Sequence, residues 1–86
     1  MTDINTTLAE RGSRYGEFPE HARITQALKR AMVGSPNWDR LPDAMKESLE
    51  MVAHKIGRIL NGDPHYKDSW HDCEGYIRLI SQTLKD

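Results

Sequence analysis

The feature that most constrains how this chain folds is an apolar stripe in its second half. Five apolar residues recur at i, i+4, i+7, i+11 and i+14, which places them on one side of an α-helix. They are Met45, Leu49, Val52, Ile56 and Ile59. Pro42 precedes the stripe and Asn61-Gly62 follows it; proline is typical of helix starts and glycine of helix ends. The pattern predicts a helix from Pro42 to about Asn61.

A second stripe follows after the short connection "NGDPHYKDS". Its residues are Trp70, Cys73, Ile77, Ile80 and Leu84. Asp68 or Ser69 is the expected N-cap of this helix, because both side chains accept hydrogen bonds from free backbone N–H groups. Two helices joined by so short a loop form an antiparallel hairpin.

Two further helices are expected in the first half of the chain. The first is short, with Thr2 or Asp3 as its cap and Gly12 as its end. The second opens at Phe18-Pro19 and stops at Gly34. No alternating strand pattern is present, so we expect an all-α fold of about four helices in a single domain, residues 1–86. A chain this short buries little surface, so we expect oligomerisation to complete the bundle.

Composition narrows the classes of function. Twelve basic residues against 13 acidic ones give a net charge of −1, which argues against a protein that coats nucleic acid. The single cysteine permits neither an internal disulfide nor a CxxC metal site and fits a reducing cytosol. The start of the chain has no basic leader followed by an apolar run, and no stretch is long enough to span a membrane. We therefore expect a cytoplasmic protein.

Two aspartates, Asp68 and Asp72, lie on one side of the last helix, opposite its apolar stripe. Like charges at this spacing repel weakly, and a divalent cation or a guanidinium between them reverses the effect. Glu47 and Glu50 lie on the preceding helix. Because Mg²⁺ prefers oxygen ligands and often pairs carboxylates with substrate phosphates, these four acids are the candidate metal ligands.

Each acid also has an ordinary structural interpretation. Asp68 is equally well explained as a helix cap. Asp72 is explained as the ion-pair partner of Arg58 or Lys55. The two glutamates are explained as part of a solvated surface, where glutamate is most often found.

A basic and aromatic pair, Arg14-Tyr15, lies on a loop between Gly12 and Gly16. An arginine beside a tyrosine suits a phosphate and a base, respectively. The alternative is that Tyr15 and Phe18 only fasten the loop to the bundle. The four histidines do not match a zinc motif, and no Ser-His-Asp or Cys-His arrangement is present.

Three segments together resemble a group of small phage and prophage proteins: "RYGEF", "LEMVAHKIGRILNG" and "DSWHDCEGY". The match spans roughly Arg11 to Leu79. That group is similar in outline to the all-α nucleoside triphosphate pyrophosphohydrolases, the MazG-like and dimeric dUTPase-like proteins. The resemblance implies a nucleotide-handling helical bundle, a dimer or tetramer, in the cytoplasm of a bacterial host.

In that superfamily an EExxE helix and an ExxD helix hold Mg²⁺, which positions the triphosphate for attack by water. Here Glu47 and Glu50 match the end of the first motif, but Lys46 replaces its leading acid. Asp72 matches the end of the second, whereas Ser69 stands at its first acid. Two acidic positions of the superfamily motifs are therefore occupied by other residues here, and the catalytic residues are not assigned.

Two hypotheses follow. In the first, the protein is a MazG-like bundle that binds a nucleoside triphosphate with Mg²⁺ and hydrolyses it. The candidate residues for phosphate or base are Arg14, Tyr15, Lys55, Arg58 and Tyr76. In the second, it is a non-catalytic oligomeric bundle that acts through protein contacts, formed by Met51, Gly75, Leu79 and Tyr76.

Overall fold

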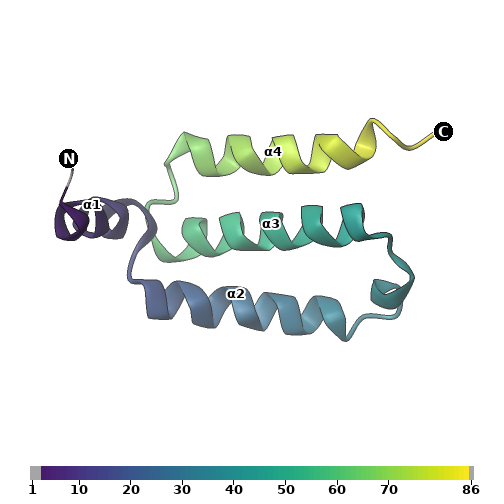
Figure 1. Ribbon diagram of the computed structural model, residues 1–86, viewed down its shortest axis with the longest axis horizontal. Helices are drawn as coiled ribbons and strands as arrows, with labels where there is room; N and C mark the ends of the chain where they lie inside the picture. The colour runs from purple at the N-terminus through teal and green to yellow at the C-terminus, as the bar shows by residue number, and fades with distance from the viewer. Residues whose placement is uncertain (1–2, 86) are drawn as a thin grey trace.

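The computed structural model describes residues 3–85 and confirms the all-α prediction for them (Figure 1). It contains four α-helices and one short 3₁₀ helix. Their bounds are α1 Ile4–Tyr15, α2 Phe18–Val33, η1 Trp38–Arg40, α3 Asp43–Asn61 and α4 Lys67–Ser81.

The third helix, α3, is the centre of the fold. It packs along α2 on one side and α4 on the other, and α1 packs on the end where α3 finishes and α2 begins (Figure 1). α3 and α4 run in opposite directions, so the predicted antiparallel hairpin is confirmed.

Several predicted helix ends are confirmed and two are wrong. Asp3 caps α1 by accepting a hydrogen bond from the Asn5 N–H, while Thr2 lies outside the described residues. Gly12 does not end α1, which continues to Tyr15 and stops at Gly16, whose φ is 79°. This glycine is needed because positive φ is costly for residues with a Cβ.

The start of α4 is the second correction. Neither Asp68 nor Ser69 caps it: the helix begins at Lys67, with Tyr66 at the N-cap position and no side-chain cap. The physical reason is the preceding turn, in which Asp63 accepts hydrogen bonds from the N–H groups of His65 and Tyr66. That turn brings the chain into helical geometry before Asp68, which therefore lies in the first turn of α4.

The buried positions of α3 carry small or polar residues rather than the apolar stripe. Ser48, Ala53, Lys55 and Gly57 are buried, whereas Leu49 is 38% exposed. Because α3 is flanked by two helices, small residues occupy the lines of closest approach. A Cβ on Gly57 would overlap the side chain of Thr25 on α2. The predicted apolar stripes of α3 and α4 are therefore only partly covered within one chain.

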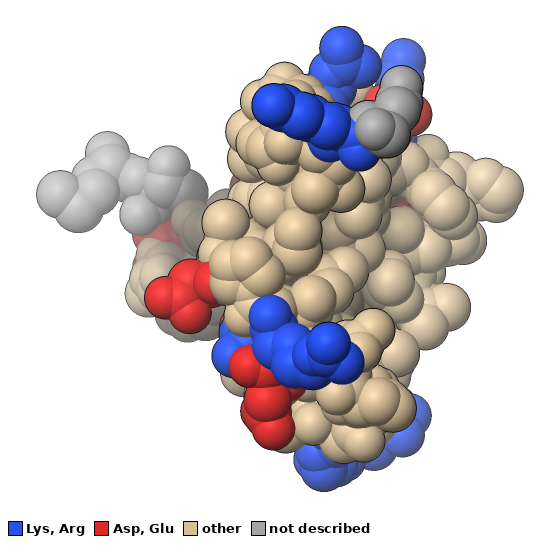
Figure 2. All heavy atoms as spheres, turned by 90° about the vertical axis from the view of Figure 1, so that its right-hand side faces the viewer, with Lys and Arg blue, Asp and Glu red and all other residues tan. Residues whose placement is uncertain are grey.

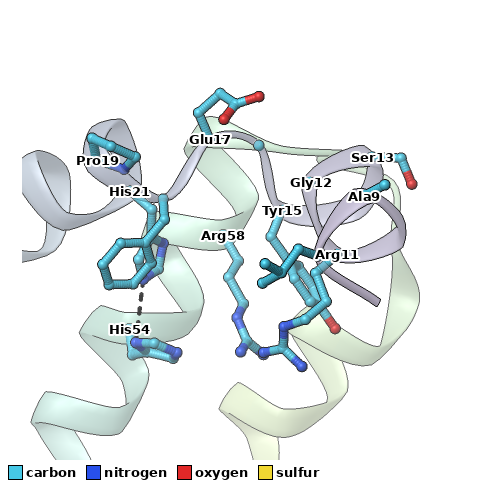
Figure 3. Close-up of a pocket in the computed structure, with 13 residues that line it drawn as sticks. Ala9, Arg11, Gly12, Ser13, Tyr15, Glu17, Pro19, His21, His54 and Arg58 are labelled. Atoms are coloured by element: carbon cyan, nitrogen blue, oxygen red, sulfur yellow. Dashed lines mark hydrogen bonds between the residues drawn. The ribbon is translucent and has the colours of Figure 1, made fainter. Parts of the chain in front are cut away.

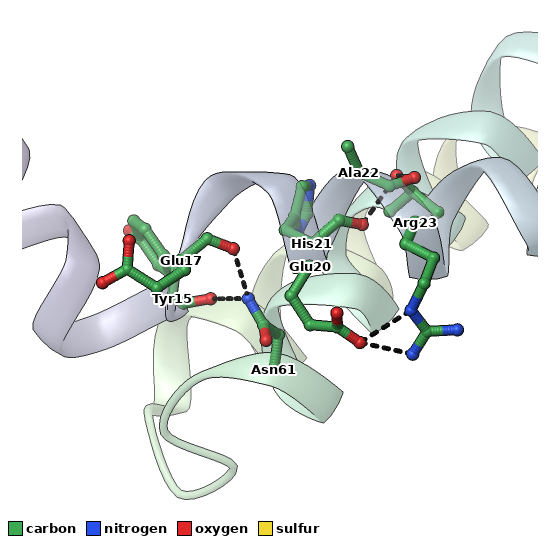
Figure 4. A network of polar contacts seen from close by, with 8 residues as sticks. Tyr15, Glu17, Glu20, His21, Ala22, Arg23 and Asn61 are labelled. Atoms are coloured by element: carbon green, nitrogen blue, oxygen red, sulfur yellow. Dashed lines mark hydrogen bonds and ion pairs between the residues drawn. The ribbon is translucent and has the colours of Figure 1, made fainter.

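Two segments far apart in sequence are joined where α1 meets α2 (Figure 4). The Asn61 side-chain amide, at the end of α3, donates to the backbone oxygens of Tyr15, at 3.0 Å, and Glu17, at 2.9 Å. The Asp63 N–H donates to the Arg14 oxygen at 2.7 Å. We call this set of contacts the α1–α3 junction. It fixes the position of the link between α1 and α2, and with it the site described next.

Candidate functional site

A cavity lies at the corner where α1, the start of α2 and the second half of α3 meet (Figure 3). Its volume is about 840 Å³, within the range of pockets that hold small organic ligands. We call it the corner pocket. Its position follows from the α1–α3 junction, because Asn61 holds the link that forms one wall.

Two arginines converge on the ring of Tyr15 in this pocket. The Arg58 guanidinium lies over the ring, 4.1 Å from its centroid, and that of Arg11 lies 5.5 Å away. Figure 3 shows the ends of the two arginine side chains close together. A tyrosine ring attracts a cation over its face, so Tyr15 orients both guanidinium groups toward the same part of the pocket.

No carboxylate neutralises these two arginines within residues 3–85. Neither Arg11 nor Arg58 forms an ion pair among them. Glu17 belongs to the pocket wall, but its carboxylate points away from the arginines (Figure 3). Glu20, on the next turn of α2, is bound by Arg23 (Figure 4). The described pocket is therefore positively charged and has room for an anion.

A pair of histidines forms the adjacent wall. The Nε2 atom of His21 and the Nδ1 atom of His54 lie 3.3 Å apart, and the rings meet edge to face. His21 is buried, and its Nδ1 atom has no hydrogen-bond partner in the described structure. Burial and the nearby Arg58 charge lower the pKa of His21 and bring that of His54 to about 4. Both rings are consequently neutral near pH 7.

Of the five residues predicted to bind phosphate or base, the structure brings Tyr15 and Arg58 together. Arg14 lies outside the pocket lining, with its guanidinium 5.7 Å from the centroid of the Tyr66 ring. Lys55 pairs with Asp72 at 2.9 Å. Tyr76, on α4, accepts a hydrogen bond at its backbone oxygen from the hydroxyl of Ser48 on α3.

Among residues 3–85, no three His, Cys, Asp or Glu side chains are grouped closely enough to hold a metal ion, so the four acidic candidates are not gathered in one place in this structure. Asp72 is held by Lys55, whose hydrogen bond and charge lower the pKa of Asp72. Asp68 accepts a hydrogen bond from the Tyr66 hydroxyl at 3.2 Å. Glu47 and Glu50 lie on α3. Magnesium binding by these residues stays a prediction.

Sequence reasoning did not identify Arg11, His21 and His54 as binding residues, and it gave Phe18 only the role of fastening the loop, although all four line the pocket. The spacing contains a signal for two of them, because residues four apart share a helix face. His54 lies four residues before Arg58, and Arg11 four before Tyr15. The sequence prediction ended the first helix at Gly12, so Arg11 and Tyr15 were not expected to share a helix face.

Comparison of the chain with models of known protein families, with curated proteins and with solved structures finds no match. Among the helices of residues 3–85, none combines the length and the apolar character that a membrane crossing requires. The function is therefore argued from the corner pocket and the exposed surfaces.

Proposed function

We propose that the corner pocket binds a nucleotide, with its phosphates at the two arginines. The observation that carries this proposal is the convergence of Arg11 and Arg58 on Tyr15 without a carboxylate partner among the described residues. Two like charges held close together repel, and an anion between them removes that cost. Arginine is also the side chain best suited to bind phosphate oxygens in pairs.

The remainder of the pocket suits the uncharged part of a nucleotide. Phe18 is 73% exposed at the pocket wall, which leaves its ring open for stacking on a base. The neutral His21 and His54 supply hydrogen-bonding nitrogens rather than charge. A volume of about 840 Å³ accommodates a base and a sugar in addition to phosphates.

Mg²⁺ enters this proposal with the triphosphate, because this cation is usually bound by phosphates and one or two carboxylates. Glu47, Glu50, Asp68 and Asp72 are the candidate carboxylates, although none of them lines the corner pocket and Asp72 would first have to leave Lys55. Pyrophosphate release from the nucleotide is the proposed reaction, in keeping with the resemblance to MazG-like proteins. It requires nucleotide binding, whereas binding does not require the reaction.

The test is a titration of the four common nucleoside triphosphates, with and without Mg²⁺, by calorimetry and thermal shift. Arg58→Gln should weaken binding about tenfold or more, because a charge-assisted hydrogen bond contributes roughly 1.5–3 kcal/mol. Arg14→Gln is the matched control, since Arg14 carries the same charge next to the pocket but does not line it. If no triphosphate binds the wild-type protein, the proposal is wrong.

A separate arm tests the metal. Asp72→Ala should reduce the effect of Mg²⁺ on triphosphate binding if Asp72 is a ligand, and leave it unchanged if Asp72 only pairs with Lys55. Release of pyrophosphate is followed in the same samples. Nucleotide binding without pyrophosphate release would support the binding proposal and refute the proposed reaction.

The second candidate function is that of a non-catalytic oligomeric bundle that acts through protein contacts. The observation that favours it is the exposure of apolar side chains along α3 and α4, among them Leu49, Ile77 and Leu79. If no nucleotide binds in the titration and the protein nevertheless self-associates, this second function is favoured over the first.

A further inference from the structure

An apolar groove lies between α3 and α4, at the end of the bundle far from the corner pocket. Its volume is about 260 Å³, and residues from 41–49 and 77–84 line it. None of the lining residues is charged. Figure 2 looks at this end of the molecule: uncharged residues cover most of it, with lysines and arginines at its top, below its middle and at its bottom, and acidic residues beside the cluster below the middle. We call this feature the α3–α4 groove.

The groove is made mainly from residues of the two predicted apolar stripes, together with Leu41. The predicted stripe of the last helix included Leu84, but α4 ends at Ser81, so Leu84 lines the groove from beyond the helix. Leu49 is 38% exposed, Ile77 46% and Leu84 57%, although each belongs to the groove lining. Helix stripes of this kind are stable when a second layer of structure covers them. Within residues 3–85, no other segment does so.

The surface area of the whole chain indicates how much is left uncovered. The chain exposes 6570 Å², whereas a compact monomer of 9.9 kDa exposes about 5200 Å². The excess is roughly 1400 Å², compared with about 800 Å² buried by each partner in an interface of standard size and more in obligate homodimers. The surplus belongs to the whole chain, including α1, which has no buried residue, and it exceeds what one side of a standard interface buries.

We propose that a second copy of this chain packs on the α3–α4 groove, so that two helix hairpins form a four-helix bundle. The contact is isologous: the same patch on each chain supplies both the groove and the side chains that fill it. Burial of the apolar stripes of α3 and α4 in both copies then gives each hairpin its second layer.

A second copy fits this surface better than an unlike partner for two reasons. Leu49, Ile77 and Leu84 line the groove and are also exposed, so the apolar side chains of one copy can pack against those of the other. The groove also lacks a charged residue with which to select a basic or acidic partner. A net charge of −1 sets up little repulsion between two copies.

This contact lies on a different face from the one expected from the sequence, which included Leu79. Ile77 and Leu79 are two residues apart on α4, about 200° around the helix, so they face opposite ways. Leu79 is 58% exposed and does not line the groove. The pair therefore provides a matched test of which face associates.

The experiment is sedimentation equilibrium of the full chain from low to high micromolar concentration, without nucleotide. We expect the wild-type protein to have twice the mass of one chain of 9.9 kDa. Ile77→Glu should shift the mass to that of one chain, because the interface would bury an unpaired charge. Leu79→Glu should remain dimeric. Circular dichroism checks that both variants are helical.

Because a separated chain can unfold, a milder pair accompanies these variants. Ile77→Ala should weaken the dimer about tenfold or more through loss of buried apolar contact, and Leu79→Ala should leave it unchanged. A wild-type protein that is monomeric throughout overturns the proposal. So does a dimer that Leu79→Glu dissociates and Ile77→Glu does not. Neither outcome depends on nucleotide binding, so this inference and the proposed function fail separately.

Discussion

Replacement of Gly57 by alanine tests the closest contact in the fold, between α2 and α3. A Cβ at this position would overlap the Thr25 methyl group and approach the His21 ring to 3.0 Å. Inserting a methyl group into a filled space typically costs about 1–3 kcal/mol. Removing a helical glycine, in contrast, contributes about 1 kcal/mol of stability. In the Gly57→Ala variant alone, this gain offsets part of the packing cost, so the measured change in stability understates that cost.

Gly75→Ala separates the two effects, because a Cβ at Gly75 on α4 meets nothing within 4 Å. Both substitutions change the same residue type inside a helix, so their difference isolates the packing cost. We expect Gly57→Ala to be less stable than Gly75→Ala by about 1–3 kcal/mol, which corresponds to roughly 4–8 °C in Tm per kcal/mol for a domain of this size.

The assay is urea unfolding followed by circular dichroism, with all proteins at one concentration because a dimer makes stability depend on it. Thr25→Ser in the Gly57→Ala background removes the methyl group that would be overlapped and keeps the hydroxyl that donates to the His21 oxygen. It should recover part of the loss. If Gly57→Ala and Gly75→Ala stabilise the protein equally, the close approach of α2 and α3 is incorrect.

Three further predictions concern the junction, the histidines and the ion pair. Asn61→Ala removes both hydrogen bonds to the α1–α2 link and should lower the free energy of unfolding, measured in urea, by about 1–3 kcal/mol. The pKa values of His21 and His54 are lowered from 6.5, to about 4 for His54. The unfolded chain thus binds more protons below pH 6.5, and stability should fall as pH drops from 6.5 toward 4. The His54→Gln variant should lose less stability between pH 7 and pH 5 than the wild type, and an equal loss would contradict the assignment. Asp72→Ala should destabilise the fold by leaving the buried Lys55 ammonium unpaired, and adding Lys55→Met should restore part of the urea midpoint.

The helices themselves could be predicted from sequence because their signals are local. The apolar stripe before Asn61 predicts α3, and the proline after Phe18 predicts α2. Both signals are formed by residues close together in the sequence, and the structure places α3 and α2 within a residue of the expected bounds. The end of α1 could not be predicted in this way. Gly12 is tolerated inside the helix, whereas Gly16 ends it next to Asn61, a residue far away in the sequence.

The candidate site was predictable only in part for the same reason. Tyr15 and Arg58 were recognised by residue type, but their partners come from three helices whose arrangement no local pattern contains. Burial was misjudged as well. The apolar stripes mark the helices but not the buried positions, because in α3 those positions are taken by residues such as Ser48 and Lys55, each paired with α4. The Lys55–Asp72 pair was among the interpretations of Asp72 that the sequence offered, whereas the contact of Ser48 with the Tyr76 backbone oxygen has no signal in the sequence.

The α1–α3 junction has a consequence for how this protein can change over evolutionary time. Asn61 and Asp63 hold the link through the backbone oxygens of Arg14, Tyr15 and Glu17, not through their side chains. Substitutions at these three positions therefore leave the fastening intact. Two of these residues, Tyr15 and Glu17, also line the corner pocket. The pocket wall can therefore acquire new chemistry while its framework stays in place, so the preference for a ligand can diverge among descendants of this chain without a new fold.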